Sequence, residues 1–312
     1  MQERTNDNFE RMILQELQKR FPGEGMVQII PVTKNNGLTL RGLTIKSKDT
    51  NVCPTLYLDS MFEQWVSGER DLLDIVDELC TMNEKYKCTK GFDVASVTHW
   101  DAVKDKIRLR LLNKELNSNR LSEIPYFTFL DLIVTFVIQL DCEHEEGVGT
   151  IQVRNEFLEM WGISKDELLE TGKKNNESSE YYIEDMFSAL AGMIGDLQEG
   201  TGLSGDTLVD SLSEPSMYVL SNSTKLFGSD IILRSDELDK LAETLHSSFF
   251  ILPSSVHELL AVPGEDEPKD ESMIEGFKSM IYTINREQVS LQERLSDSLY
   301  HYNRHTHLVS IC

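Results

Sequence analysis

The sequence has little cysteine and no paired cysteine motif. There are five cysteines, an odd number with irregular spacing: Cys53, Cys80, Cys88, Cys142 and Cys312. Because no CxxC pair occurs, a zinc ribbon and a thioredoxin-like redox site are not supported. Reduced thiols in a cytosolic protein fit this pattern, and we expect neither a structural metal nor a cofactor.

The sequence also has no long apolar segment. Its first residues include no apolar stretch of the kind that a secretory signal peptide needs. The longest apolar run, Phe127 to Leu140, is too short to span a bilayer and contains Asp131. We therefore expect a cytoplasmic protein with no membrane partner.

Basic residues are scarce relative to acidic ones. The 312 residues include 30 Lys and Arg but 53 Asp and Glu, which gives a formal net charge of -23. Such a charge repels nucleic-acid phosphates, so nucleic acid is excluded as a partner. An acidic, solvated surface explains the charge, and so does a partner protein with a basic surface.

The N-terminal part begins with a predicted amphipathic helix, residues 8–21, followed by a hairpin signal. The alternating residues 38–45 follow Asn35-Asn36-Gly37, and an Asn-Gly pair favours a tight turn because both residues tolerate positive φ. Two more helices are predicted at residues 71–86 and 99–113. The second would carry a basic face, Lys104, Lys106, Arg108 and Arg110, which is either ion-paired or an anion site.

The polar stretch from Asn113 to Glu123 is the best candidate for a domain boundary. It divides an N-terminal lobe, residues 1–120, from a larger C-terminal lobe, residues 121–312, although one continuous domain fits the sequence as well. In the C-terminal lobe, strands are predicted at 129–140, 150–153, 217–222 and 230–233. Helices are predicted at 181–194, 236–246, 273–284 and 291–302. This order predicts an α+β fold with mixed, largely antiparallel sheets covered by helices.

Residues 200–205, GTGLSG, match the GxGxxG pattern of dinucleotide sites literally. A dinucleotide site requires a strand before the glycines and a helix after them. Here a helix is predicted before the glycines and a polar loop after them. We therefore interpret the stretch as a loop and expect no nucleotide there.

The segment Ser248 to Pro263 combines a dense apolar run with Ser254, Ser255, His257 and Glu258. Ser, His and Glu are the components of a hydrolytic triad. In an extended strand, however, Ser255 and His257 would lie roughly 6.5 Å apart, beyond a direct hydrogen bond. A polar turn in which Ser255 or Glu258 bonds backbone N–H groups is the alternative that we favour. Contact with a ligand or partner remains a third interpretation.

Three histidines lie near the C-terminus. His301 and His305 are four residues apart and would share a helix face, as zinc-binding histidines do. No carboxylate or cysteine lies close to them in sequence except Cys312. We interpret His301, His305 and His307 as exposed or partner-facing residues and predict no metal site.

Several stretches together resemble an uncharacterised bacterial family, domain of unknown function 5688. They are residues 32–45, 51–58, 217–222, 252–258 and 295–300. The resemblance covers nearly the whole chain and implies a stand-alone cytosolic protein of similar length. It implies no activity. It draws attention to candidate binding residues within these stretches: Lys34, Asn35, Asn36, Asn222, Ser254 and His257.

Two functional classes follow from the sequence. The first is a non-catalytic protein-interaction or ligand-binding module. The second is a hydrolase or ligand-binding enzyme with a site around Ser254, Ser255, His257 and Glu258. A pocket that joins His257 to Lys34, Asn35 or Asn222 would favour the second class, whereas a His257 held by backbone would favour the first.

Overall fold

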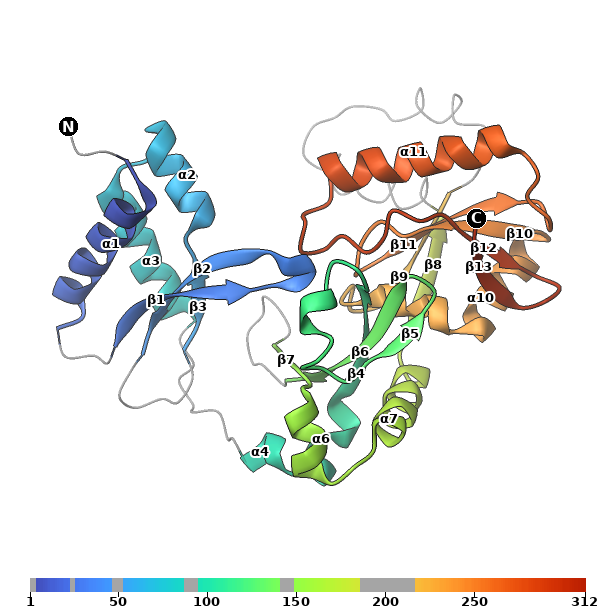
Figure 1. Cartoon of the computed structure of the whole chain (residues 1–312), viewed down its shortest axis with the longest axis horizontal. Coiled ribbons are helices and arrows are strands. Elements are labelled where there is room, and N and C mark those ends of the chain that lie inside the picture. The colour runs from blue at the N-terminus through green and yellow to red at the C-terminus, as the bar shows by residue number, and fades with distance from the viewer. Residues whose placement is uncertain (1–3, 23–25, 47–52, 87–94, 141–148, 186–216) are drawn as a thin grey trace, which may run out of the picture. The chain divides into compact units, whose positions relative to one another are not determined.

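A computed structural model describes residues 4–22, 26–46, 53–86, 95–140, 149–185 and 217–312 (Figure 1). The chain divides into two compact units. The N-terminal unit holds the described residues up to Ala102, and the C-terminal unit holds those from Val103 onward. The division into lobes of residues 1–120 and 121–312, or their union in one continuous domain, stays a prediction.

The N-terminal unit is a three-stranded antiparallel sheet with helices packed on it. Strand β2 (Thr39–Ile45) lies between β1 (Val27–Thr33) and β3 (Thr55–Tyr57). The helices are α1 (Asn6–Arg20), α2 (Asp59–Ser67), α3 (Leu72–Tyr86) and α4 (Ala95–Thr98). Phe9, Ile13 and Leu17 recur at helical spacing along α1, and all three are buried in one core with Leu43 and Leu79.

The predicted Asn-Gly turn joins β1 to β2. Thr33 pairs with Thr39, so residues 34–38 form the connection, which includes the 3₁₀ turn η1 (Asn35–Gly37). Asn36 (φ 58°) and Gly37 (φ 72°) both lie in the left-handed region. Positive φ at both central positions is the turn geometry that matches strand twist and that Asn-Gly favours.

The C-terminal unit contains two antiparallel sheets. In the smaller one, β6 (Leu132–Gln139) pairs with β4 (Ile107–Asn113), β5 (Phe127–Phe129) and β7 (Thr150–Gln152). Helices α6 (Asn155–Trp161) and α7 (Lys165–Glu177) follow. A Cβ on Gly172 of α7 would come within 2.6 Å of the Leu109 side chain, so the glycine allows the helix to approach the sheet closely.

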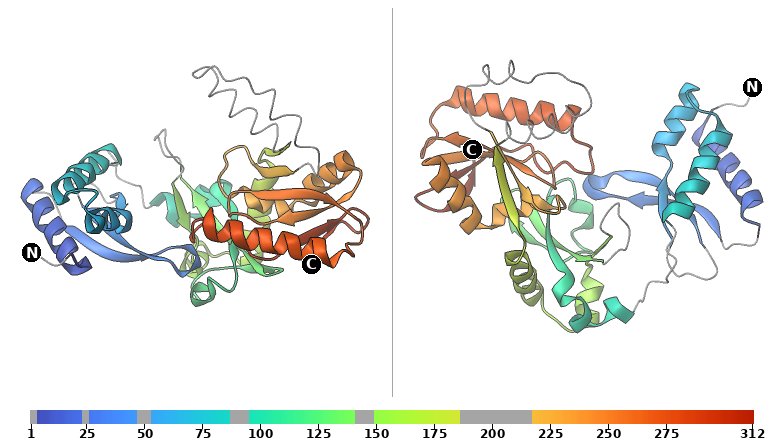
Figure 2. Two further views of the ribbon diagram at one scale, coloured as in Figure 1. Left: turned by 90° about the horizontal axis from the view of Figure 1, so that it is seen from above. Right: turned by 180° about the vertical axis from the view of Figure 1, so that it is seen from behind.

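The larger sheet has the strand order β13-β12-β10-β11-β9-β8. These strands are β8 (Tyr181–Asp185), β9 (Tyr218–Asn222), β10 (Ser248–Leu252), β11 (Leu259–Gly264), β12 (Tyr300–Asn303) and β13 (Leu308–Ile311). The helical segments are η4 (Gly228–Leu233), α10 (Ser235–Leu245) and α11 (Glu271–Glu287). Figure 2 shows α11 lying along the sheet, where Ile281 shares a core with Phe250, Leu252 and Val262.

The predicted helix at residues 99–113 is wrong beyond its first turn. It consists of α5 (Trp100–Val103), the 3₁₀ turn η2 (Lys104–Lys106) and strand β4. Buried Ile107, Leu109 and Leu111 recur every two residues, but the spacing from Ile107 to Leu111 also fits a helix face. Arg108 and Arg110 therefore lie on a strand, not on a helix.

Three other predicted elements are also wrong. The helix expected at 291–302 is irregular until β12 begins, the strand expected at 230–233 is part of η4, and the helix expected at 181–194 begins as β8. Its remainder, like the glycine pattern at 200–205, lies outside the described residues. In each case pairing with a distant strand or a tight turn overrides the local pattern.

The sheets and helices confirm the predicted α+β class. In the part of the chain that the structure describes, no helix combines the length and the apolar character needed to cross a bilayer.

Candidate functional site

Ser255 supports the turn between β10 and β11. Its Oγ accepts hydrogen bonds from the N–H groups of His257 (3.0 Å) and Glu258 (3.2 Å). The Ser255 N–H in turn donates to the Glu258 carbonyl at 3.3 Å. These bonds confirm the predicted turn. The Ser255 hydroxyl accepts backbone N–H groups that have no strand partner among the described residues after β10 ends.

His257 is held by backbone groups from a neighbouring loop. Its Nδ1 accepts the N–H of Phe227 at 3.3 Å, and its ring stacks on the Phe227 ring with centroids 5.8 Å apart. Its carbonyl accepts the Ser221 hydroxyl at 2.7 Å. Burial lowers the pKa of His257, and the Glu293 carboxylate acts in the opposite direction.

The other predicted binding residues have local roles. Asn222 supports the next loop, because its side chain bonds both backbone groups of Leu226 at 2.8 and 3.2 Å. Lys34, Asn35 and Asn36 belong to the hairpin of the N-terminal unit, where the Lys34 Nζ lies 4.2 Å from the centre of the Tyr57 ring.

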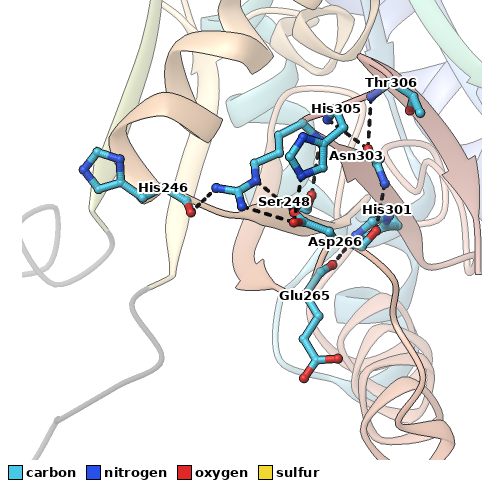
Figure 3. A network of polar contacts seen from close by, with 9 residues as sticks. His246, Ser248, Glu265, Asp266, His301, Asn303, His305 and Thr306 are labelled. Atoms are coloured by element: carbon cyan, nitrogen blue, oxygen red, sulfur yellow. Dashed lines mark hydrogen bonds and ion pairs between the residues drawn. The ribbon is translucent and has the colours of Figure 1, made fainter.

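The C-terminal histidines each bond a different acceptor. His301 bonds the Glu265 carbonyl, His305 bonds Asp266 at 2.9 Å, and His307 bonds Asp239 at 2.6 Å. Figure 3 shows His301 and His305 in the network around Asp266, which the Ser248 hydroxyl joins at 2.7 Å.

The network around Asp266 stabilises its charged carboxylate. The hydrogen bonds from Ser248 and then His305 hold the pKa of Asp266 well below its usual range. Among the described residues, no group of three or more His, Cys, Asp or Glu side chains is placed to hold a metal ion.

A cavity of 670 Å³ is lined by both sheets of the C-terminal unit. Its size is typical of a small-molecule site. Apolar side chains come from β4, β5, α7, η4 and β13, and they include Leu109, Phe127, Phe129, Leu169, Ile232 and Val309. Two of these strands, β5 and β13, lie at sheet edges.

Asp230 of η4 is the buried polar group of this cavity, with 4% of its surface exposed. Its Oδ2 accepts hydrogen bonds from the Tyr181 hydroxyl (2.9 Å) and from the Asn176 side-chain amide. Its Oδ1 is also buried and has no hydrogen-bond partner among the described residues. Burial raises the pKa of Asp230 to about 7, although the Tyr181 hydrogen bond opposes this shift.

The basic side chains that line the cavity are in ion pairs, whereas, within the described residues, two of its acidic side chains are not. Lys173 pairs with Glu170 at 3.0 Å, and Arg234 pairs with Asp236 at 2.7 Å. Glu177 and Asp230 also line the cavity, and neither has an ion-pair partner within the described ranges. The cavity therefore offers carboxylates rather than cations to a ligand.

A second cavity of 340 Å³ shares Asp230, Asn176 and Leu109 with the first. Its other lining residues are mainly polar and include Ser178, Asn222 and Thr224. Asp230 thus borders two cavities, and the predicted residue Asn222 lines one of them. His257 lines neither.

The sequence did not indicate Asp230, Asn176 or Tyr181. Tyr181 lies 49 positions and Asn176 lies 54 positions before Asp230, so no local sequence pattern brings the three residues together. The available signal was the position of Asp230 directly before the apolar residues 231–233, since a carboxylate in such a place is either exposed or specifically bonded.

Comparison with known proteins gives one match. The model of a family described as "Family of unknown function (DUF5688)" matches residues 6–304 of the 312-residue chain. No curated protein matches the chain, and no solved structure does. The match confirms the predicted resemblance and assigns no reaction or ligand.

Proposed function

Because the chain belongs to DUF5688, a family of unknown function, we propose a function from the cavity itself: the C-terminal unit binds a small organic amine. The observation that carries this proposal is Asp230, a buried carboxylate among the cavity-lining residues whose Oδ1 has no hydrogen-bond partner within the described residues. A buried acceptor without a donor is unfavourable by about 1–3 kcal/mol, which an ammonium or N–H group of a ligand would recover.

The lining also supports an amine with an apolar body. Phe127, Phe129 and Leu169 offer apolar surface, whereas both lining cations are paired with carboxylates of the chain. An ammonium group would meet Asp230 and Glu177, and a hydrocarbon or aromatic body would cover the apolar wall. A lysine side chain of a basic partner protein has the same chemistry.

Binding without catalysis fits the turn at Ser255 better than hydrolysis does. The Ser255 oxygen already accepts two backbone N–H groups, and His257 Nδ1 accepts a third. A serine nucleophile needs a histidine that accepts its proton, and here both side chains serve the turn. We place this cofactor-free binding module in the bacterial cytoplasm.

Benzylamine tests the proposal by isothermal titration at pH 8, where Asp230 is ionised. We expect the protein to bind benzylamine and to bind the neutral isostere benzyl alcohol at least tenfold more weakly. Asp230→Asn keeps the size of the side chain and should remove this preference. Glu275→Gln changes an exposed carboxylate of α11, far from the cavity lining in sequence and paired with Lys278, and serves as the matched control.

Equal affinity of Asp230→Asn and the unchanged protein for benzylamine would reject the amine site. Nα-acetyl-lysine amide, titrated in parallel, separates a free small amine from a lysine side chain as the natural ligand. Binding of this probe but not of benzylamine would favour a basic protein partner.

A further inference from the structure

Arg110 on β4 is a largely desolvated cation without a carboxylate partner. Its Cζ lies 4.6 Å from the centre of the Phe227 ring, and its Nε is buried with no hydrogen-bond partner. No ion pair within the described ranges involves Arg110. An aromatic face attracts a guanidinium but does not replace the hydrogen bonds that its N–H groups lose on burial.

Two further arginines lie beside the same sheet. Arg154 follows Val153, whose N–H donates to the Phe136 carbonyl on β6 at 2.9 Å. Phe136 pairs with Leu109, the residue before Arg110. The end of β7 therefore brings Arg154 to the level of Arg110.

Arg120 ends the 3₁₀ turn η3 (Ser118–Arg120). The residues that follow this turn are bonded to Asn155, the residue after Arg154. The Glu123 carbonyl accepts the Asn155 N–H at 3.0 Å, and the Asn155 side chain donates to the Ser122 carbonyl at 2.9 Å. Burial, and then repulsion from Arg120, lowers the pKa of Arg110 to about 10. Burial and then Arg154 lower the pKa of Arg120, and the Glu123 carboxylate acts in the opposite direction.

The nearby carboxylates compensate this charge only in part. Glu123 pairs with Arg154 at 3.5 Å and also attracts Arg120, whereas Glu258 and Glu293 act on His257. The chain has 53 acidic residues, yet none of the described ones pairs with Arg110 or Arg120. Three clustered, partly buried cations with one counter-charge are unfavourable unless an anion from outside joins them.

We propose that Arg110 and Arg120 form an oxyanion site, at which a small molecule is held by a phosphate or carboxylate group. Arginine presents N–H donors in a planar fork that matches both groups, and the side chain of Arg110 remains partly exposed to receive one. Arg154 lies beside this pair of arginines but is already paired with Glu123. This site is separate from the amine-binding cavity, whose lining contains none of the three arginines.

Thermal unfolding at constant ionic strength tests the site with three sodium salts: phosphate, succinate and chloride. We expect phosphate or succinate to raise Tm in a saturable manner relative to chloride. A response to phosphate alone identifies phosphorylated compounds as ligands, and a response to succinate alone identifies carboxylates. Equal Tm values in all three salts would overturn the proposal.

Arg110→Met removes the charge while keeping an unbranched side chain. We expect this variant to lose the anion response and to have a Tm in chloride at least as high as the unchanged protein, because the uncompensated charge is gone. A merely structural Arg110 would give a lower Tm and an unchanged response, which would also overturn the proposal.

Arg120→Gln and Arg110→Lys keep the test decisive if Arg110→Met does not fold. Each should weaken the apparent anion affinity at least fivefold, since one variant loses a charge and the other loses the fork of donors. Arg286→Gln is the control, because Arg286 already pairs with Asp297 at 2.8 Å. An unchanged affinity in both test variants would reject the site.

Discussion

The Tyr300 hydroxyl donates a hydrogen bond of 2.6 Å to the carboxylate of Asp131, 169 residues earlier in the chain. The hydroxyls of Ser296 (2.5 Å) and Ser298 (3.0 Å) donate to the same carboxylate. Asp131 lies between β5 and β6, and Tyr300 begins β12, so this carboxylate joins the two sheets of the C-terminal unit. Residues 295–300, one of the stretches that resemble the family, therefore have a structural role, which is to bond Asp131.

Tyr300→Phe should lower the free energy of unfolding by about 2 kcal/mol, because it removes a buried hydrogen bond to a charged group. Urea denaturation followed by fluorescence measures the change. Tyr282→Phe removes a hydroxyl from an exposed side chain of α11 and should leave stability unchanged. A Tyr300→Phe protein as stable as this control would contradict the role given to Asp131.

Gly37→Val should destabilise the N-terminal unit by about 1 kcal/mol or more, because valine resists the φ of 72° at this position. Gly276→Ala makes a useful comparison, since a Cβ at Gly276 of α11 meets nothing within 4 Å. That change should stabilise the protein by roughly 0.5–1 kcal/mol. Thermal unfolding of both variants checks the two signs, and an unaffected Tm for Gly37→Val would count against the turn geometry.

Ser255→Ala should lower stability by about 1 kcal/mol, as the loss of a helix-cap hydroxyl does. Ser254→Ala is the neighbouring control and should have little effect. A fluorophosphonate probe, which labels activated serines, should not label the protein. Labelling that disappears in either folded variant would instead support the hydrolase alternative.

Asp230 should make stability depend on pH. Its folded pKa of about 7 exceeds the ordinary value of 3.8, so the folded state holds a proton that the unfolded state releases. The stability that this proton provides is complete below about pH 4 and is lost as pH rises through 7, at roughly 1.4 kcal/mol per pKa unit. Asp230→Asn should lose this dependence and should gain stability relative to the unchanged protein between pH 5 and pH 8.

Asp236→Asn gives a control of opposite sign for the same titration. The hydrogen bond from Arg234 lowers the pKa of Asp236, so its contribution is present above the ordinary pKa and is lost as pH falls. Chemical denaturation at several pH values compares both variants. An Asp230→Asn protein with the pH profile of the unchanged protein would show that Asp230 is not the buried acid described above.

Local chemistry made part of the fold predictable. Asn36-Gly37 and Ser255 each specify a turn through their own side chain or backbone freedom, and an uninterrupted apolar run specified the buried strand β10. Strand β4 was not predictable, because its spacing suits a helix equally well over one heptad. The basic residues within 104–110 indicate, as one alternative, an anion site that includes Arg110, although on a helix. The partners of Asp230 and Arg110 are brought near only by tertiary packing, so the sequence did not indicate them.

The strand order of the larger sheet means that the two neighbours of β10 are synthesised at different times. β10 consists of buried residues and pairs with β11, which ends at residue 264, but its other neighbour, β12, lies at residues 300–303. Until that strand emerges, the nascent chain presents an apolar strand with one unpaired edge, a surface on which other chains can add. A chain whose synthesis stops between these two points would therefore leave this apolar edge open to other chains.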